Sequence, residues 1–257
     1  MIELKKVSKA YAGQKVLDGI TVTLERGRVH GFVGRNGSGK TVLMKCVAGL
    51  LRPDAGEVYV DGRRIGTELE TPPDMGAIIE VPGFLPNASG YRNLKYLADI
   101  SGRAGDQEIR AAMQRCGLDP DSRKWVSKYS LGMRQRLGIA QAIMEDPSLL
   151  ILDEPMNGLD NAGVEDARRL LMELKEKGKT IILASHNQQD IDALCDAVYE
   201  MNAGRLTRVR CGRDPRRQNR LPFRWEAVQS ADKACKRKNC PEQKEIRGNF
   251  CFLRQLH

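Results

Sequence analysis

The chain has 257 residues, of which 41% are hydrophobic and 5% aromatic, so it can form one large folded domain with an additional segment. No apolar run approaches the roughly 18–20 residues that a membrane-spanning helix needs, which argues against an integral membrane protein. The sequence begins MIELKKVSKAY and lacks the apolar stretch of a secretion signal, so we expect a protein that stays in the cytosol.

The net charge of +9 is distributed unevenly along the chain. Residues 209–257 contain 13 Lys/Arg and 5 Asp/Glu, which leaves a net charge of +1 for the rest. Little of the basic excess belongs to the main domain, and we therefore expect no nucleic acid as its partner. Seven cysteines without framework spacing argue against a set of disulfides.

Hydrophobic periodicity predicts short strands over residues 1–30, the last of them a strand over Val29–Gly34 that enters a glycine-rich loop. A helix is predicted over Lys40–Leu51 and a buried strand over Met75–Glu80. Residues 82–145 are richer in helix-forming patterns than in strand patterns.

The second half of the chain alternates strands with helices. Apolar runs predict strands over Leu149–Glu154 and Thr180–Ser185, with a helix over Val164–Lys177 between them. A closing hairpin follows, with its turn predicted at Asn202–Gly204.

This alternation is typical of a parallel core sheet covered by helices, so we predict an α/β fold. The short N-terminal strands indicate an antiparallel β-subdomain, and the segment at about residues 85–145 indicates an inserted helical subdomain. Near residue 208 the periodicity weakens and charged residues become frequent. We therefore assign residues 1–208 to the domain and residues 209–257 to a basic C-terminal extension.

A phosphate-binding motif follows the strand predicted at Val29–Gly34. The segment GRNGSGKT fits the pattern G-x-x-x-x-G-K-[ST] and stands between a predicted strand and a predicted helix. Backbone N–H groups and a helix N-terminus can surround phosphate oxygens, while Lys40 reaches the β- and γ-phosphates and Thr41 binds Mg²⁺. The candidate nucleotide-binding residues are Gly34, Arg35, Asn36, Gly37, Ser38, Gly39, Lys40 and Thr41. The alternative, a glycine-rich turn with an incidental lysine, is disfavoured by this context.

Polar side chains follow two further apolar strands. Asp153 ends one strand, where its carboxylate can hold Mg²⁺, and Glu154 comes next as a candidate to polarise attacking water. His186 ends the next predicted strand, where a neutral imidazole can bond the γ-phosphate or the water. A solvated acid at 154 and a structural histidine at 186 are the alternatives. Their positions at neighbouring strand ends favour catalytic roles.

Together these residues resemble the ATP-binding domain of ABC transporters, which has a P-loop NTPase fold. GRNGSGKT is similar to its Walker A motif, LLILDE to Walker B, SLGMRQ to the signature and NGLD to the D-loop. The resemblance implies that Tyr11 stacks on adenine and that His186 is the switch histidine. It also implies that Ser130 and Gly132 contact the ATP of an opposite subunit, while the Asp160 turn bridges the two sites.

The chain departs from the family pattern at three places. The signature usually reads LSGGQ and here reads YSLGM, so Ser130 and Gly132 are kept while Met133 cannot make the polar contacts of glutamine. Glu80 stands at the Q-loop position, where the resemblance implies contact with Mg²⁺ and water, and it adds a negative charge near the phosphates. Asn161 stands where a proline often follows the D-loop, and we expect little effect.

The resemblance implies a Mg²⁺-dependent ATPase, with ATP and Mg²⁺ as cofactors, that powers a separate integral membrane permease. IIEVPGFLPNASGYRNL and YSLGMRQRLGIAQAI are most similar to exporters of bacitracin- or lantibiotic-type peptides and related drugs. It further implies a homodimer, or a heterodimer with a similar ATPase, that holds ATP between its subunits. Val81–Leu94 would contact the permease, which would keep the cytoplasmic chain on the inner face of the cell membrane.

Two other functions stay open at this point. One is a soluble ABC-class ATPase that acts on nucleic acid or ribosomes, which a single motif set without sustained heptads disfavours. The other is a regulatory protein that binds ATP without hydrolysing it, which Glu154 and His186 disfavour. Plain structural roles are the alternatives at two further positions: Tyr11 packed within a small sheet, and Glu80 as a strand-end acid in solvent.

The extension contains four cysteines among its basic residues, namely Cys211, Cys235, Cys240 and Cys251. Their spacing is not that of a paired C-x₂-C zinc site. Contact with a membrane surface or nucleic acid would rest on charge alone. We expect a loosely packed extension.

Overall fold

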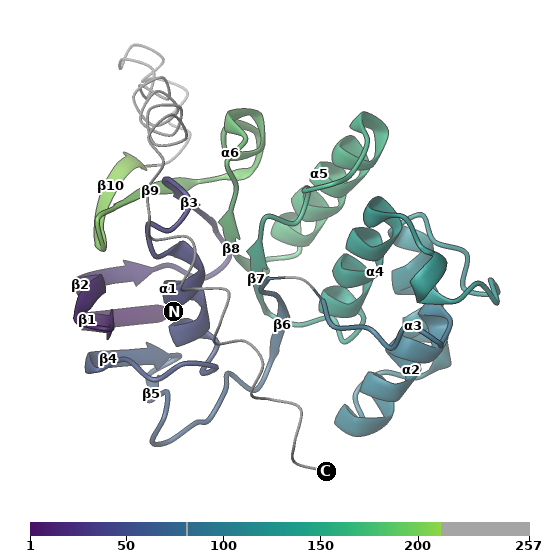
Figure 1. Ribbon diagram of the computed structural model, residues 1–257, viewed down its shortest axis with the longest axis horizontal. Helices are drawn as coiled ribbons and strands as arrows, with labels where there is room; N and C mark the ends of the chain where they lie inside the picture. The colour runs from purple at the N-terminus through teal and green to yellow at the C-terminus, as the bar shows by residue number, and fades with distance from the viewer. Residues whose placement is uncertain (81, 212–257) are drawn as a thin grey trace. The chain divides into compact units, whose positions relative to one another are not determined.

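The computed structural model describes residues 1–80 and 82–211 (Figure 1). The predicted extension lies outside the described residues from residue 212 onward, and with it three of its four cysteines, namely Cys235, Cys240 and Cys251. The interpretations of its cysteines and of its charge therefore stay predictions. The elements in chain order are β1 (Ile2–Tyr11), β2 (Gln14–Leu24), β3 (Val29–Val33), α1 (Lys40–Val47), β4 (Ala55–Val60), β5 (Arg63–Arg64), β6 (Met75–Ile78), α2 (Gly90–Ser101), α3 (Asp106–Arg115), the 3₁₀ turn η1 (Val126–Lys128), α4 (Leu131–Ile143), β7 (Leu149–Asp153), α5 (Asn161–Glu176), β8 (Thr180–Ala184), α6 (Gln188–Leu194), β9 (Ala197–Asn202) and β10 (Arg205–Cys211).

The N-terminal strands form an antiparallel sheet in the order β2-β1-β4-β5. Ile2, Leu4 and Val7 of β1 are buried, and the residues between them along the strand are more exposed. Side chains alternate between the two faces of a strand, so this sheet turns one face to the core and the other to solvent. The predicted antiparallel β-subdomain is confirmed.

The second sheet holds six strands in the order β10-β9-β3-β8-β7-β6. Five of these strands, β9, β3, β8, β7 and β6, run parallel to one another, whereas β10 runs antiparallel to β9. β3 and β8 are buried along their whole length, as expected where helices cover both faces of a sheet. The β9–β10 hairpin turns through Ala203 and Gly204, which have φ values of 46° and 76°. The predicted parallel core sheet is confirmed, and the final strand makes it mixed.

Helix α1 lies between the two sheets, whose inner residues share one core with it (Figure 1). Its buried apolar residues are Leu43, Met44, Cys46 and Val47. The helix ends at Val47 rather than at the predicted Leu51. Gly49 adopts a φ of 76°, and the N–H of Leu50 bonds back to the Lys45 carbonyl at 2.9 Å, a turn that closes a helix.

Helix α5 begins at Asn161, three residues before the predicted start at Val164. The side chain of Asp160 accepts a hydrogen bond from the N–H of Gly163 at 3.1 Å. This bond caps the first turn, which carries no apolar periodicity and was therefore not recognisable from hydrophobic spacing alone.

Between β6 and β7 the chain forms α2, α3, η1 and α4, which lie together on the side of β6 and β7 away from the antiparallel sheet (Figure 1). The limits of a helical subdomain and the domain edge near residue 208 stay predictions, and β10 runs past that position to Cys211. Over residues 1–80 and 82–211, no helix has the length and apolar character needed to cross a membrane.

Candidate nucleotide site

The carboxyl ends of β3, β6, β7 and β8 meet along one edge of the parallel sheet, where ligands bind in folds of this kind. A cavity of about 540 Å³ opens at this edge. It is lined by Tyr11, Val16, Asn36, Gly37, Gly39, Lys40, Thr41, Val42, Glu80, Pro82, Leu131, Arg134, Gln135, Asp153, Glu154 and Asn157. Five parts of the sequence therefore share one cavity: the β1–β2 strands, the phosphate loop with the start of α1, the segment after β6, the start of α4, and the end of β7 with the turn after it.

Glycine is required at two positions of the phosphate loop because the loop lies against neighbouring backbone. Gly34 has a φ of 150°, and a Cβ there would lie 2.3 Å from the carbonyl oxygen of Met201. Gly39 has a φ of 107°, and its Cβ would lie 2.7 Å from the carbonyl oxygen of Val16. Side chains at these positions would clash with backbone atoms that cannot move aside.

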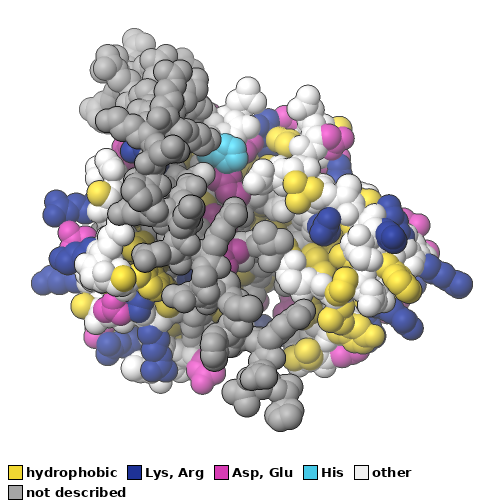
Figure 2. Space-filling view, in the orientation of Figure 1, with side chains coloured by type: hydrophobic (Ala, Val, Ile, Leu, Met, Phe, Trp, Pro, Cys, Tyr) yellow, Lys and Arg dark blue, Asp and Glu magenta, His cyan; other side chains and the backbone are white. Residues whose placement is uncertain are grey.

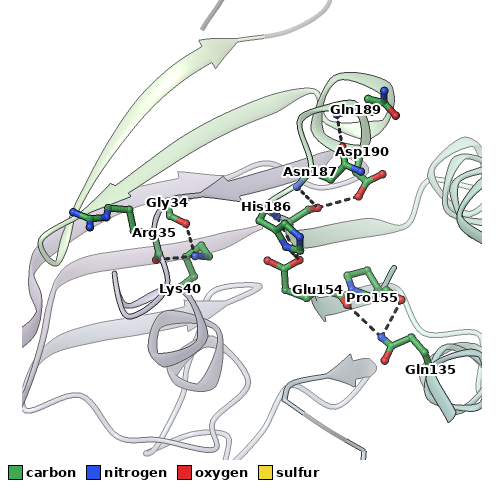
Figure 3. A network of polar contacts seen from close by, with 11 residues as sticks. Gly34, Arg35, Lys40, Gln135, Glu154, Pro155, His186, Asn187, Gln189 and Asp190 are labelled. Atoms are coloured by element: carbon green, nitrogen blue, oxygen red, sulfur yellow. Dashed lines mark hydrogen bonds and ion pairs between the residues drawn. The ribbon is translucent and has the colours of Figure 1, made fainter. Parts of the chain in front are cut away.

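Lys40 and Ser38 place a cation and a hydroxyl group at the phosphate loop. The Lys40 ammonium donates to the carbonyl oxygens of Gly34 at 2.7 Å and Arg35 at 3.1 Å (Figure 3). Within the described part of the chain, the buried hydroxyl oxygen of Ser38 has no hydrogen-bond partner. A buried polar group without a partner is unfavourable, and a phosphate oxygen in the loop would supply one. The loop therefore fits an anionic group.

Thr41 and Asp153 join the start of α1 to the end of β7. The Thr41 hydroxyl donates to Asp153 Oδ2 at 2.5 Å, and both residues line the cavity. Hydroxyl and carboxylate oxygens suit Mg²⁺, which proteins hold through one or two carboxylates together with phosphate oxygens of the substrate. Across residues 1–80 and 82–211, no cluster of three His, Cys, Asp or Glu side chains could hold a metal without such help.

Glu154 and His186 contact each other at the ends of the adjacent strands β7 and β8 (Figure 3). His186 Nδ1 lies 2.7 Å from Glu154 Oε2. The N–H of Glu154 donates to the carbonyl of Ala184 at 3.0 Å, which ties the two strand ends together. Glu154 also has a φ of 51°, a conformation that is unusual for a residue with a side chain and that is often found at functional positions.

A buried acid anchors the loop that carries His186 (Figure 3). Asp190 is 2% exposed and accepts from the Ser185 hydroxyl at 2.9 Å and from Arg168 Nη2 of α5 at 2.5 Å. The Ser185 oxygen in turn accepts from the N–H of Asn187 at 3.1 Å. The residues on both sides of His186 are thereby fixed. Removing Arg168 would leave the buried carboxylate of Asp190 without its ionic partner in a low-dielectric setting.

Glu80 follows β6 and lines the cavity beside the other acids. Its carboxylate accepts from the Lys45 ammonium at 2.7 Å, and its φ is 63°. Both acids that follow adjacent strands, Glu80 and Glu154, thus have a left-handed backbone. Glu80 is thus a strand-end acid that is 55% exposed and has an ionic partner, and its role at the nucleotide site stays a prediction.

Tyr11 ends β1 and lines the cavity with 48% of its surface exposed. The Lys9 ammonium lies 5.7 Å from the centre of its ring. A ring this exposed is not packed inside the small sheet, and it can stack on another flat ring.

Ser130, Gly132 and Asp160 lie outside the lining of this cavity. The Ser130 hydroxyl caps α4 by accepting from the N–H of Met133 at 3.2 Å. A Cβ on Gly132 would lie 3.0 Å from the carbonyl oxygen of Gly158, so α4 packs closely on the turn that leads to Asp160. Three residues that the sequence assigns to nucleotide binding therefore lie near one another, outside the lining of the cavity.

A family model described as ABC transporter matches residues 17–157, more than half of the chain. The chain belongs to the ABC transporter family. As a member of this family it is an ATP-binding subunit and an ATPase. The similarity expected from the Walker, signature and D-loop motifs is confirmed.

Three relatives show how closely this ABC ATPase matches particular members. An uncharacterized ABC transporter ATP-binding protein of Bacillus subtilis (strain 168), YybJ, is 43% identical over 206 residues, which cover 80% of this chain and 94% of that protein. The bacitracin transport ATP-binding protein BcrA of Enterococcus faecalis is 41% identical, with 80% and 68% covered. The lantibiotic transport ATP-binding protein SrtF of Streptococcus pyogenes is 32% identical, with 80% and 89% covered. The expected similarity to bacitracin- and lantibiotic-type proteins is confirmed.

A solved structure of an ATP-binding cassette, a dimer in a post-hydrolysis state bound to ADP and Pi, has a TM-score of 0.75 to this chain. The two are 22% identical, and the match covers 82% of this chain and 99% of that one. This likeness confirms the fold of the ABC ATPase.

Several side chains at the site were not recognisable as site residues from the sequence. Gln135 of α4 donates to the carbonyl oxygens of Pro155 at 2.9 Å and Glu154 at 3.3 Å, so the signature helix holds the turn after β7 (Figure 3). The only available signal was that Gln135 stands inside the SLGMRQ segment. Arg168 and Asp190 belong to none of the family motifs.

Proposed function

We propose that this ABC ATPase uses Mg²⁺ with ATP to drive a separate integral membrane permease that exports a drug or an antimicrobial peptide. The cargo proposal is supported by the names of two relatives, which describe bacitracin transport and lantibiotic transport. Contacts with the cargo would lie on the permease, so the contribution of this chain would be the free energy of ATP hydrolysis.

The observation that carries the proposal is the convergence of three groups at one sheet edge: Lys40, the Thr41–Asp153 pair and the Glu154–His186 pair. The N–H groups of the phosphate loop and Lys40 would hold the β- and γ-phosphates, with the Ser38 hydroxyl as a further donor. Thr41 and Asp153 would hold Mg²⁺, with Glu80 near enough to assist. Mg²⁺ supplies charge neutralisation at the phosphate oxygens. Tyr11 would stack on adenine.

Glu154 would act as the general base. Its carboxylate would accept a proton from the water that attacks the γ-phosphorus, while the bond from that phosphorus to the bridging oxygen breaks and ADP and phosphate are released. His186 contacts one Glu154 oxygen at 2.7 Å and would hold the carboxylate in its productive orientation while sensing the γ-phosphate. Asp190 would set the position of that histidine through Ser185.

We further propose that two chains, or this chain and a similar ATPase, close on ATP as a dimer. Ser130 and Gly132 stand at the start of α4, outside the cavity of their own chain. The helix N-terminus, the hydroxyl and the glycine N–H suit a γ-phosphate presented by a second subunit. The Asp160 turn, packed beside Gly132, would connect the two nucleotide sites.

Exposed apolar side chains on α2 and on the connecting segments before α2 and η1 support a permease partner. Figure 2 shows hydrophobic side chains gathered over the region of α2 and α3. The large exposed residues in this part of the chain are Leu85, Tyr96, Leu97, Ile100 and Trp125. Exposed patches of this kind mark interaction sites. Through this contact the chain would reside at the inner face of the cell membrane.

Affinity capture of the tagged chain from detergent-solubilised membranes checks the partner. An integral membrane protein should be recovered in stoichiometric amount. Recovery of ribosomes or DNA without an integral membrane protein would overturn the permease proposal and favour a soluble ABC-class ATPase.

Glu154→Gln tests the assignment of the base. The variant should bind ATP with the affinity of the parent, while turnover falls by about 10²-fold or more because the amide accepts no proton. ATP should then keep it as a dimer, measured by size-exclusion chromatography with and without nucleotide.

Glu173→Gln is the matched control, since Glu173 pairs with Arg115 on the surface at 3.2 Å, outside the cavity. It should hydrolyse ATP at the parent rate. Hydrolysis by Glu154→Gln at the parent rate would show that another group is the base.

A further inference from the structure

One face of α1 contacts two acids at the sheet edge. Thr41 Oγ1 lies 2.5 Å from Asp153 at the end of β7, and Lys45 Nζ lies 2.7 Å from Glu80 just after β6. Positions 41 and 45 are one helical turn apart and therefore face the same way. Because β6 and β7 are parallel neighbours, the two acids follow adjacent strands at the same edge.

The charges that line the cavity do not favour a nucleotide by themselves. The lining contains three carboxylates, from Glu80, Asp153 and Glu154, against two cations, Lys40 and Arg134. ATP is strongly anionic, so a carboxylate without a compensating charge weakens its binding. Lys45 is not part of the lining, yet it contacts the one of these acids that follows β6.

The pair is partly withdrawn from solvent on the lysine side. The Lys45 side chain is 28% exposed and that of Glu80 is 55% exposed. Glu80 also keeps a φ of 63°, which is unfavourable for a residue with a side chain and persists where surrounding contacts fix it. The contact with Lys45 is one such contact, and it holds the carboxylate against α1.

We propose that Lys45 is a positioning residue of the nucleotide site. Its ammonium holds the Glu80 carboxylate and offsets its charge, and this compensation lets a chain with an acid at position 80 bind ATP with Mg²⁺. The effect of Lys45 passes through Glu80 and not through contact with the nucleotide. The inference rests on the proposed function, since it takes this cavity as the ATP site.

The test is a double-mutant cycle on the Kd of a fluorescent, non-hydrolysable ATP analogue with Mg²⁺, titrated into the whole chain. Lys45→Met should raise the Kd about three- to fivefold in the parent. In the Glu80→Gln background the same change should alter the Kd by less than about twofold, because no charge is left to offset. Lys45→Arg, which keeps the charge, should retain the parent Kd. Thermal unfolding of all five proteins verifies that they are folded.

If Lys45 instead attracted the phosphates directly, Lys45→Met would raise the Kd by the same factor in the parent and in the Glu80→Gln background. That result would overturn the proposal. An unchanged Kd in Lys45→Met would overturn it as well. Failure of the proposed function is distinguishable, since the parent itself would then not bind the analogue.

Discussion

The sheet edge and the start of α4 use their polar groups in opposite ways. At the sheet edge, each acid is bonded to a residue far away in sequence: Asp153 to Thr41, Glu154 to His186 and Glu80 to Lys45. At the start of α4, the Ser130 hydroxyl bonds only three residues ahead, to the N–H of Met133.

The difference indicates which subunit supplies the nucleotide that each region contacts. The three acids of the sheet edge line one cavity within a single chain and are held by long-range contacts, so this half of the site is assembled by the tertiary structure. Ser130 and Gly132, at the start of α4, are organised locally and are not among the residues that line that cavity, as expected for groups that act on a ligand carried by another subunit.

The largest expected effect is the recovery of turnover when two inactive variants are mixed, and it tests whether the two regions act in different subunits. Thr41→Ala should lower turnover about 10²-fold by disturbing the sheet edge, and Ser130→Ala by a similar factor at the start of α4. If the two regions act in different subunits, a mixed dimer keeps one intact site. An equal mixture should then recover about a quarter of the parent turnover, because half of the dimers are mixed and each has one site of two.

If the mixture is no more active than either variant alone, both regions act on the same ATP within one subunit, and the proposed division between subunits is wrong. Ser89→Ala provides a matched control, since the Ser89 hydroxyl caps α2 through the N–H of Arg92 at 3.3 Å in the same way as Ser130 caps α4. Both serine variants should lose about 1 kcal/mol of stability, measured by urea unfolding. Only Ser130→Ala should lose turnover.

A smaller effect is expected on the rate of thiol modification, which compares how nucleotide binding stabilises the phosphate-loop helix α1 and the helix α3. Burial raises the pKa of Cys46, in α1, to about 11 and the pKa of Cys116, after α3, to about 12. At pH 8 both thiols are therefore protonated in the folded chain, and they react only when local structure opens. An ATP analogue at about five times its Kd should slow the modification of Cys46 about sixfold and leave Cys116 unchanged.

Peptide mass spectrometry over a time course of alkylation measures both cysteines in one sample. Full reactivity of both in denaturant is the control. Equal slowing of Cys46 and Cys116 would mean that the phosphate-loop helix and the inserted helices open as one unit, and the two regions would then not be separable in stability.

Much of the sheet edge could be predicted because its chemistry lies in short contiguous segments. GRNGSGKT predicts the phosphate loop by itself, and the apolar runs before Asp153 and His186 predict that both residues follow neighbouring strands. The strand and helix order follows from the same alternation of apolar patterns. The early end of α1 did not follow, because it depends on the left-handed Gly49 and not on apolar spacing.

The contacts that hold the site could not be predicted. Lys45 and Glu80 are 35 residues apart, and Arg168 and Asp190 are 22 apart. Charged residues are common on helices, and hydrophobic periodicity carries no information on which of them meet. Such pairs follow from the contact of α1 with the segment after β6 and from the packing of α5 on α6, which only the folded chain defines.

The position of β3 in its sheet has a consequence for how the protein is made. β3 leads into the phosphate loop, yet its two neighbours are β8 and β9, which begin at Thr180 and Ala197. A ribosome that adds roughly 5–20 residues per second completes the phosphate loop many seconds before either neighbour exists. Until then both edges of an apolar strand are unpaired, a state prone to wrong pairing. A nascent chain stalled before Thr180 would thus carry the whole phosphate motif, but β3 would still be unpaired. We expect such a chain to need a chaperone that shields β3, because ATP cannot supply the missing strands.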